Sequence, residues 1–598
     1  MEKLLLRICG LVVELCMLAA CNRHHQVQIP SAPAAPTISV DHTANQVVLS
    51  WAPVSEADYF VIKKDSTGVS GFSQIGTSLT ATYSDHFASL TDWITARYKV
   101  AACSRGGCSD SVVVAAYSNQ LINYFKASNT GIGDNFGYSV ALSADGTTLA
   151  VGAYNEGSAA SGIDGDQLDN SAPNSGAVYV FTRTGVSWSQ QAYLKASNSE
   201  ASDLFGISLS LSADGSELAV GATGESSGAS SVNGNETDNS APSSGAVYLF
   251  ARSGTTWTQY AYIKASNAET FDLFGSSVAL AGDGKTLAVG ALEEDSLATG
   301  VNGNQSNGPY GIYVQSGAAY VFVLKNSAWV QEAYIKASNS SGLDYFGNCV
   351  ALSNDGNTLV VGAEAERSTA TGVNGDQSDK SGLGNGAAYV FTRSGTNWTQ
   401  QAYIKGSNTG PEDYFGFSVS LSADGDTLAI GALGEDSNTS GVNGDQSDDS
   451  AEASGAAYVF TRVGNIWTQQ SFIKASNPDP YDDFGYTVAL SASGNLLVVG
   501  SPLESGNSIG VNGNESDNSK SGSGAVYLFT RTNELWAQRA YLKSPNTGVD
   551  DIFGFNAALS ADGNTLAVGA TSEDSSSTGL NGNQADEDAP ASGAVFVF

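Results

Sequence analysis

The chain has 598 residues, which is enough for several domains or for one large repeat array with an accessory domain. Its formal net charge is −34, and 51 of its 60 Asp and Glu residues follow residue 120, against 18 of its 26 Lys and Arg residues. This charge disfavours nucleic acid and anionic lipid as direct partners, because both need a basic surface. Cations or basic surfaces are favoured, and a merely soluble, carboxylate-rich surface is the alternative.

Residues 1–21 predict an export signal. Lys3 and Arg7 accompany a mainly apolar stretch, residues 8–20, which is too short to span a membrane and ends in Leu-Ala-Ala before Cys21. This ending resembles the lipobox of bacterial lipoproteins, in which the Cys is lipidated and becomes the mature N-terminus. The resemblance implies Cys21 as the lipidation site of an exported protein, anchored by lipid alone in the outer membrane or at the cell surface. Plain secretion is the alternative, since Glu14 interrupts the apolar stretch.

Residues 22–35 are expected to form a linker, and residues 36–119 alternate apolar and polar residues in short runs separated by turn residues. This pattern predicts a small β-sandwich. Trp51 and the run Tyr98-Lys99-Val100 make the segment similar to a fibronectin type III domain, which implies a spacer or a weak binding module. Cys103 and Cys108 have a spacing that can close a hairpin disulfide in an oxidising compartment.

Seven copies of one repeat fill residues 120–598. Each copy contains Phe-Gly, and the successive spacings of this pair are 69, 69, 72, 69, 69 and 69 residues. The first repeat predicts four strands, at residues 136–143, 148–153, 175–181 and 188–195, and the turn between the first two is Asp-Gly in six of the seven repeats. Four strands in each of seven repeats predict an all-β fold, a seven-bladed β-propeller with four-stranded blades.

The two ends of the array complement each other. The seventh repeat stops after its third strand at Phe598, and residues 124–129 resemble the fourth-strand sequence at residues 193–198. We therefore expect this N-terminal strand to complete the last blade and close the ring, which removes exposed sheet edges. A solenoid would instead need polar caps at both ends.

The run Phe-Gly-x-Ser-Val-Ala-Leu, followed by Val-Gly-Ala and Gly-Ala-Val-Tyr-Val-Phe, resembles the FG-GAP repeat of the integrin α-subunit propeller and its bacterial relatives. The resemblance covers all seven repeats. It implies non-enzymatic binding of an extracellular protein or glycan, and adhesion, often with calcium in the loops. One departure is that a tight Asp-Gly hairpin stands where the integrin calcium loop lies.

A possible calcium site begins with a Glu four residues after the Gly of Val-Gly-Ala, at the start of a long polar loop. Oxygen side chains at positions one, three and six of an Asn/Asp-Gly-Asp/Asn motif in this loop can wrap Ca²⁺ together with the Glu and backbone carbonyls. The alternative is ordinary turns whose side chains cap their own backbone. The third loop departs from the motif, ending in Asn307. The candidate ligands are Glu156, Asp164, Asp166, Asp169, Glu225, Asn233, Asn235, Asp238, Glu366, Asn374, Asp376, Asp379, Glu435, Asn443, Asp445, Asp448, Glu504, Asn512, Asn514, Asp517, Glu573, Asn581, Asn583 and Asp586.

An Asp two residues before each Phe-Gly pair and a Lys eight residues before that Asp also recur. Sevenfold repetition at fixed spacing predicts a structural role where one blade passes to the next, such as an ion pair between them. The Asp residues are Asp134, Asp203, Asp272, Asp344, Asp413, Asp482 and Asp551.

Catalysis finds little support in the sequence. All four His residues precede the repeats, which therefore have no His base and no His metal ligand. A carbohydrate hydrolase should show one loop unlike the others, and only the third repeat deviates, with an insertion at residues 309–313. We therefore predict a non-enzymatic binding protein. A propeller enzyme acting on carbohydrate and a structural envelope component are the alternatives.

Overall fold

The computed structural model describes residues 31–43, 46–66, 71–87, 89–117, 122–307 and 314–598. Cys21, the export signal and the insertion at residues 309–313 lie outside these ranges. None of the helices in the described ranges combines the length and the hydropathy needed to cross a membrane. The chain divides into an N-terminal domain, up to Phe87 and over Ala96–Ala116, and a repeat domain, over Ala88–Thr95 and Tyr117–Phe598.

The N-terminal domain consists of two antiparallel sheets that share one apolar core. The first sheet contains β1 (Ile38–Thr43), β2 (Gln46–Trp51) and β5 (Thr82–His86). The second contains β4 (Ser73–Ser78), β3 (Tyr59–Asp65), β6 (Arg97–Ser104) and β7 (Gly107–Asp110), with β8 (Val114–Ala115) paired to β6. The core includes Trp51 and Tyr98. Cys103 and Cys108 form a disulfide across the β6–β7 hairpin.

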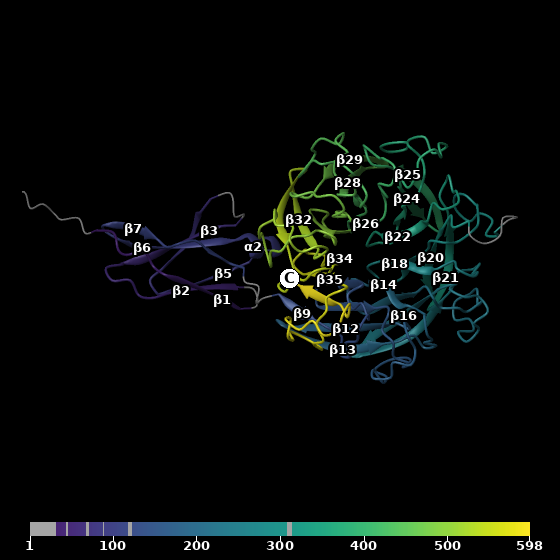
Figure 1. Cartoon of the computed structure of the whole chain (residues 1–598), viewed down its shortest axis with the longest axis horizontal. Helices are drawn as coiled ribbons and strands as arrows, with labels where there is room; N and C mark the ends of the chain where they lie inside the picture. The colour runs from purple at the N-terminus through teal and green to yellow at the C-terminus, as the bar shows by residue number, and fades with distance from the viewer. Residues whose placement is uncertain (1–30, 44–45, 67–70, 88, 118–121, 308–313) are drawn as a thin grey trace, which may run out of the picture. The chain divides into compact units, whose positions relative to one another are not determined.

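The repeat domain is built from seven four-stranded antiparallel sheets. The strand order follows the chain in six of them, and the fourth strand of the seventh comes from the start of the domain. The first strand of each sheet faces the centre of the arrangement and the fourth lies at its periphery (Figure 1). The first strands are β10 (Ser139–Leu142), β14 (Phe205–Leu211), β18 (Phe274–Leu280), β22 (Phe346–Leu352), β26 (Val419–Leu421), β30 (Thr487–Leu490) and β34 (Phe553–Leu559). The second strands are β11 (Thr148–Ala153), β15 (Glu217–Ala222), β19 (Thr286–Ala291), β23 (Thr358–Ala363), β27 (Thr427–Ala432), β31 (Leu496–Ser501) and β35 (Leu566–Ala570).

The third and fourth strands carry most of the aromatic core. The third strands are β12 (Ala177–Thr184), β16 (Ala246–Ser253), β20 (Ala318–Lys325), β24 (Ala387–Ser394), β28 (Ala456–Val463), β32 (Ala525–Thr532) and β36 (Ala594–Val597). The fourth strands are β13 (Ser187–Leu194), β17 (Thr256–Ile263), β21 (Ala328–Ile335), β25 (Asn397–Ile404), β29 (Ile466–Ile473), β33 (Leu535–Leu542) and, in the seventh sheet, β9 (Asn123–Phe125). β9 precedes all the other strands of the repeat domain in sequence and pairs with β36, with Tyr124 opposite Phe596.

Glycine at two positions allows neighbouring sheets to approach closely. A Cβ atom on Gly152, in the Val-Gly-Ala of the first sheet, would lie 2.1 Å from the carbonyl oxygen of Gly206, in the Phe-Gly of the second. Gly206 itself has a φ of +92°, which favours glycine. The corresponding contact between the seventh and first sheets places a Cβ on Gly569 at 2.2 Å from the carbonyl oxygen of Gly137. The two glycines of the repeat are thus a requirement of sheet packing.

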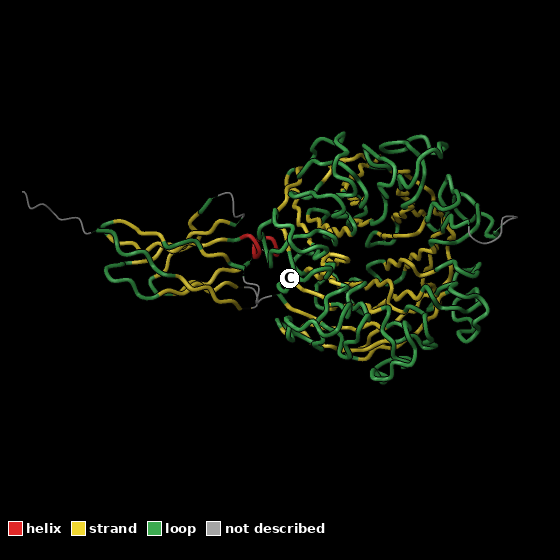
Figure 2. Tube along the Cα trace, viewed as in Figure 1, coloured by secondary structure: helices red, strands yellow, loops and turns green. Residues whose placement is uncertain are grey.

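One helix in the described ranges was not expected from the sequence. α2 (Leu90–Thr95) interrupts the strands of the N-terminal segment but belongs to the repeat domain (Figure 2). Leu90 and Ile94 are buried in the same apolar cluster as Leu496 and Phe598. The backbone N–H of Leu90 donates a hydrogen bond to Asn564 Oδ1 at 3.1 Å. The helix therefore packs on the hairpin ends of the sixth and seventh sheets.

Candidate functional site

A buried ion pair occupies the same place in all seven sheets. In the first sheet, Lys195 Nζ lies 2.9 Å from Glu156 Oε2 and donates a hydrogen bond to Ser175 Oγ at 2.7 Å. Burial lowers the pKa of Lys195, and Glu156 opposes that shift. The other pairs are Lys264–Glu225 (2.8 Å), Lys336–Glu294 (2.6 Å), Lys405–Glu366 (3.2 Å), Lys474–Glu435 (2.7 Å), Lys543–Glu504 (2.8 Å) and Lys126–Glu573 (2.8 Å).

The same carboxylate also binds the preceding connector, the segment that joins one sheet to the next. Asn129 follows β9 of the seventh sheet, and its Nδ2 donates to Glu156 Oε1 of the first sheet at 2.9 Å. The hydroxyl of Tyr179 donates to Asn129 Oδ1. Both oxygens of Glu156 are therefore engaged inside the protein. The seven Glu residues hold consecutive sheets together, and the calcium-ligand role expected for six of them stays a prediction.

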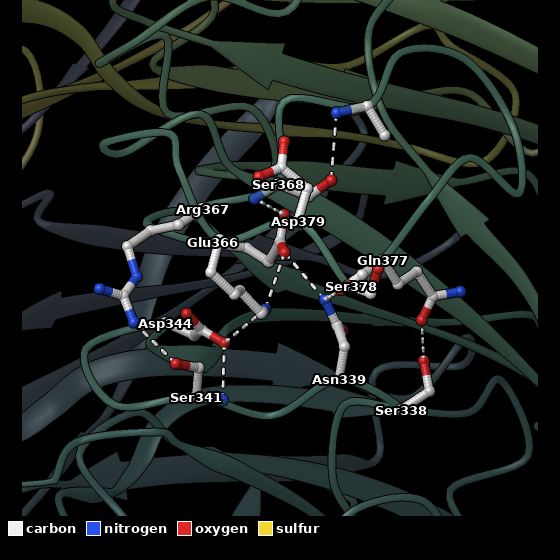
Figure 3. A network of polar contacts seen from close by, with 12 residues as sticks. Ser338, Asn339, Ser341, Asp344, Glu366, Arg367, Ser368, Gln377, Ser378 and Asp379 are labelled. Atoms are coloured by element: carbon white, nitrogen blue, oxygen red, sulfur yellow. Dashed lines mark hydrogen bonds and ion pairs between the residues drawn. The ribbon is translucent and has the colours of Figure 1, made fainter.

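In the fourth sheet this network also contains Lys380 and Arg367, and Figure 3 shows Arg367 beside Ser341 and Asp344. Lys380 Nζ lies 3.0 Å from Glu366 Oε1 and 3.7 Å from Asp344 Oδ2. Arg367 donates to Ser341 Oγ at 2.7 Å. Burial raises the pKa of Glu366, but Lys405 and Lys380 outweigh burial and hold it below its ordinary value.

The recurrent Asp residues have a structural role, but their partner is not the Lys that the spacing indicated. Asp134 Oδ2 accepts the N–H of Gly131 at 2.8 Å, which closes a turn in the connector, while Lys126 pairs with Glu573. The residues on either side of Asp134 have positive φ, +77° at Gly133 and +55° at Asn135. Burial raises the pKa of these carboxyls, to about 6 for Asp134, about 7 for Asp203, Asp344, Asp413 and Asp551, and about 8 for Asp272 and Asp482.

Position one of the long-loop motif caps the fourth strand of its own sheet. Asp164 has a φ of +53°, its Oδ1 accepts the N–H of Tyr193 at 2.9 Å, and its own N–H donates to the Tyr193 carbonyl. Asp and Asn tolerate this backbone conformation, which explains their recurrence. The equivalent bonds are made by Asn233 (2.9 Å), Asn302 (3.0 Å), Asn374 (3.0 Å), Asn443 (2.9 Å), Asn512 (3.0 Å) and Asn581 (2.9 Å).

Positions three and six form turns with their own backbone. Asp166 Oδ1 accepts the N–H of Leu168 at 3.0 Å, and Asp169 Oδ1 accepts the N–H of Ser171 at 3.1 Å. Asn235, Asp376, Asp445, Asn514 and Asn583 repeat the first bond, and Asp238, Asp379, Asp448, Asp517 and Asp586 the second. Across the described ranges, no three or more Asp, Glu, His or Cys side chains are grouped so that they could hold a metal ion. The hydrogen bonds of these side chains are those of the turn interpretation.

The position that follows Phe-Gly breaks the sevenfold pattern. It is aromatic in the fifth, sixth, seventh and first sheets, and its ring centroids form a chain: Phe417 to Tyr486 at 4.9 Å, Tyr486 to Phe555 at 4.8 Å and Phe555 to Tyr138 at 5.0 Å. Tyr154 extends the chain, 4.3 Å from Tyr138. We call these five half-buried residues the aromatic arc. The second, third and fourth sheets carry Ile207, Ser276 and Asn348 instead.

Two carboxylates accompany the aromatic arc. Burial raises the pKa of Glu364, which follows β23, to about 7, and that of Asp483, just before the Phe-Gly of the sixth sheet, to about 6. Glu364 Oε2 accepts Asn348 Nδ2 at 3.2 Å. Neither the aromatic arc nor these carboxylates were predicted from the sequence. They could have been found by comparing the repeats, because the residue type at these positions changes from repeat to repeat while the neighbouring positions stay the same.

The repeats match a known family. The model of the FG-GAP repeat matches residues 122–181, 188–250, 257–322, 329–391, 398–460 and 467–529. A search of curated proteins finds no match.

Three solved structures resemble the chain weakly. The RRP9 WD40 repeats have 8% identity, covering 80% of this chain and 96% of that one at a TM-score of 0.42. A fibronectin type III domain of human fibronectin type III domain containing protein 3 has 20% identity, covering 15% and 87% at 0.11. A Ca²⁺-stabilised, ice-binding adhesin of an Antarctic bacterium has 10% identity, covering 86% and 99% at 0.13. The six family matches together span more than half of the sequence, and the chain therefore belongs to the FG-GAP repeat family, with an all-β fold of the β-propeller type.

Proposed function

We propose that this protein is a non-enzymatic binding protein of the cell surface, with the seven sheets acting as blades of one closed propeller. Lipid on Cys21 would anchor it in the outer membrane, and a fibronectin type III-like domain would act as the spacer. The ligand is a protein or a glycan outside the cell. Nucleic acid is excluded from the proposal by the acidic charge, and contact with the membrane is through the lipid alone.

The observation that carries this proposal is the aromatic arc. Most repeated polar residues of the domain are used in ion pairs, turns and strand caps that hold the sheets together. Phe417, Tyr486 and Phe555 instead occupy a position that varies between sheets, and they are only half-buried. Aromatic side chains supply large contact area for little loss of conformational entropy, which makes them frequent anchors of binding sites.

Calcium in the long loops remains part of the proposal, at the Asn and Asp oxygens of the loop motif, because the Glu carboxylates are already bound to Lys and Asn. Catalysis has no part in it. The repeats contain no His, and the recurrent carboxylates are engaged in structural contacts.

A capture experiment tests the function. The chain without residues 1–21 and with Cys21→Ser is immobilised and presented with envelope proteins and with a glycan array, with and without Ca²⁺. We expect one retained ligand class, lost in the variant Tyr138→Ala, Phe417→Ala, Tyr486→Ala, Phe555→Ala. Ile207→Ala, at the same position in the second sheet, is the control and should keep the ligand. Capture that is equal in all three proteins would refute the role of the arc.

A further inference from the structure

The buried Lys–Glu pair of the fourth sheet lacks a partner that the other six sheets share. In those six, the Lys donates a hydrogen bond to the Oγ of a Ser that lies two residues before the third strand. The distances are 2.7 Å for Lys126–Ser592, Lys195–Ser175, Lys264–Ser244, Lys474–Ser454 and Lys543–Ser523, and 2.8 Å for Lys336–Ser316. In the fourth sheet Asn385 stands in place of this Ser.

The backbone around Asn385 matches that of the other sheets. β24 pairs with β25 in the same register as β12 with β13. The N–H of Gly386 donates to the carbonyl of Glu366 at 2.9 Å, the bond that Gly176 makes in the first sheet. The Cβ of Asn385 therefore lies where the Ser Cβ lies in the other sheets. Its amide carbon is one bond from that Cβ, as the Ser Oγ is, which brings this carbon within reach of Lys405.

The amide of Asn385 is buried without a hydrogen bond to its oxygen. The residue is 2% exposed, and its Oδ1 is among the buried oxygens of the described side chains that have no partner. A Cβ on Gly382 would lie 2.0 Å from this Oδ1, so the glycine makes room for the amide. Four other sheets carry Ala at the position of Gly382, namely Ala172, Ala241, Ala451 and Ala589. Because a buried acceptor without a donor costs free energy, the two linked departures from the repeat require a reason.

Lys405 and Glu366 provide a nucleophile and a base beside this amide. Both residues are fully buried, and Lys405 Nζ lies 3.2 Å from Glu366 Oε2, the longest of the seven Lys–Glu distances. Burial lowers the pKa of Lys405, although Glu366 opposes the shift. Burial thereby favours the neutral amine, which is the nucleophilic form of a Lys side chain.

We propose that Lys405 and Asn385 form an isopeptide bond, a covalent amide that links the residue after β25 to the segment before β24. Glu366 takes one proton from the Lys405 ammonium, and the resulting amine attacks Cγ of Asn385. The Cγ–Nδ2 bond then breaks, and Nδ2 leaves as ammonia with a second proton from Nζ. The reaction needs no oxidant, reductant or co-reactant, and it replaces a buried ammonium with a neutral amide. It is independent of the surface ligand proposed above.

Mass spectrometry of the reduced chain without residues 1–21 tests this inference. We expect a mass lower than that of the sequence by one molecule of ammonia. Trypsin does not cleave after an acylated Lys, so digestion of the denatured chain should yield a branched peptide in which Asn385 and Lys405 are joined. Lys474, the equivalent Lys of the fifth sheet, is the internal control, and trypsin should cleave after it. The full sequence mass with separate linear peptides would overturn the inference, and so would a loss of ammonia without the branched peptide.

Two variants assign the roles of the residues. Asn385→Ser introduces the residue of the other six sheets, and this variant should have the mass of its sequence and normal cleavage after Lys405. Glu366→Gln keeps both reacting residues but removes the base, and it should slow the formation of the link by about a hundredfold or more. Thermal melting verifies that each variant is folded. A loss of ammonia and blocked cleavage after Lys405 in Asn385→Ser would overturn the link to Asn385, and an unchanged rate in folded Glu366→Gln would overturn the role of Glu366.

Discussion

At the scale of the residue, the buried Lys–Glu pair accounts for the most regular polar pattern of the sequence. Lys336 and Glu294 are both inaccessible to water and 2.6 Å apart. Burying a charge costs desolvation free energy, and the attraction to the partner charge offsets this cost. When the partner is removed, the cost remains and nothing offsets it.

We predict that Glu294→Gln lowers the free energy of unfolding by about 3 kcal/mol, since it leaves the Lys336 ammonium buried without a counter-charge. The double variant Glu294→Leu, Lys336→Met should recover part of the loss. Urea denaturation measures both. Lys285→Ala is the control, because Lys285 and Asp283 are exposed and 3.8 Å apart, and its effect should stay within about 0.5 kcal/mol. Equal losses at the two Lys–carboxylate pairs would contradict the prediction.

A second residue-scale prediction concerns the glycine of Val-Gly-Ala. A Cβ on Gly290 would lie 2.0 Å from the carbonyl oxygen of Gly347 in the next sheet. Backbone cannot yield as a flexible side chain can, so Gly290→Ala should cost about 3 kcal/mol or more, measured by urea denaturation. Gly185→Ala is the control, because it tests the effect of backbone conformation without a steric clash. Gly185 has a φ of +63° and open space around it, and its substitution should cost about 1–2 kcal/mol. A smaller loss at Gly290 than at Gly185 would contradict this account of sheet contact.

At the scale of the element, each connector holds a buried Asp whose raised pKa makes stability depend on pH. Burial raises the pKa of Asp272 from 3.8 to about 8, and the charges of Glu294, Glu269 and Asp295 add to the rise. Between these two pKa values the folded state binds a proton that the unfolded state has released. The contribution of Asp272 to stability is therefore present at low pH and is lost as the pH rises toward 8.

We predict that Asp272→Asn becomes more stable relative to the unmodified chain as the pH rises from 5 to 8. The amide oxygen can still accept the N–H of Glu269 but does not ionise. The change should be about 3 kcal/mol over this interval, read from urea unfolding curves at each pH. Asp283→Asn, at an exposed hairpin, is the control. A constant difference between Asp272→Asn and the unmodified chain would show that Asp272 is ionised throughout.

The elements differ in how far the sequence predicted them. The four strands of each sheet could be predicted because apolar runs and turn residues recur at the same positions in every repeat. The partner of Lys195 could not, because Glu156 is 39 residues away and only the sheet brings it near. α2 was missed because its six residues carry no helical period of useful length. The aromatic arc was missed because its members come from four different repeats, and no single repeat contains more than two of them.

At the scale of the whole molecule, the seventh sheet takes its fourth strand from the far end of the repeat domain. β9 pairs with β36, and Lys126, just after β9, reaches Glu573 of the same sheet. Tyr124 also hydrogen-bonds Glu573, at 2.9 Å. Without this segment the edge of β36 would be exposed and Glu573 would lose its counter-charge. The domain would therefore lose stability in two ways, through lost strand pairing and through an uncompensated buried charge.

We predict that a chain beginning at Ser128 melts well below a chain beginning at Tyr117 and self-associates. Both chains lack the N-terminal domain and α2, so the comparison isolates the segment that contains β9 and Lys126. The exposed edge of β36 is a template for pairing with a second copy, and light scattering should detect dimers or larger species only in the shorter chain. A synthetic peptide of residues 117–127 added in excess should raise its melting temperature by mass action. Equal melting temperatures and monomeric behaviour of both chains would mean that β9 contributes nothing to the integrity of the seventh sheet.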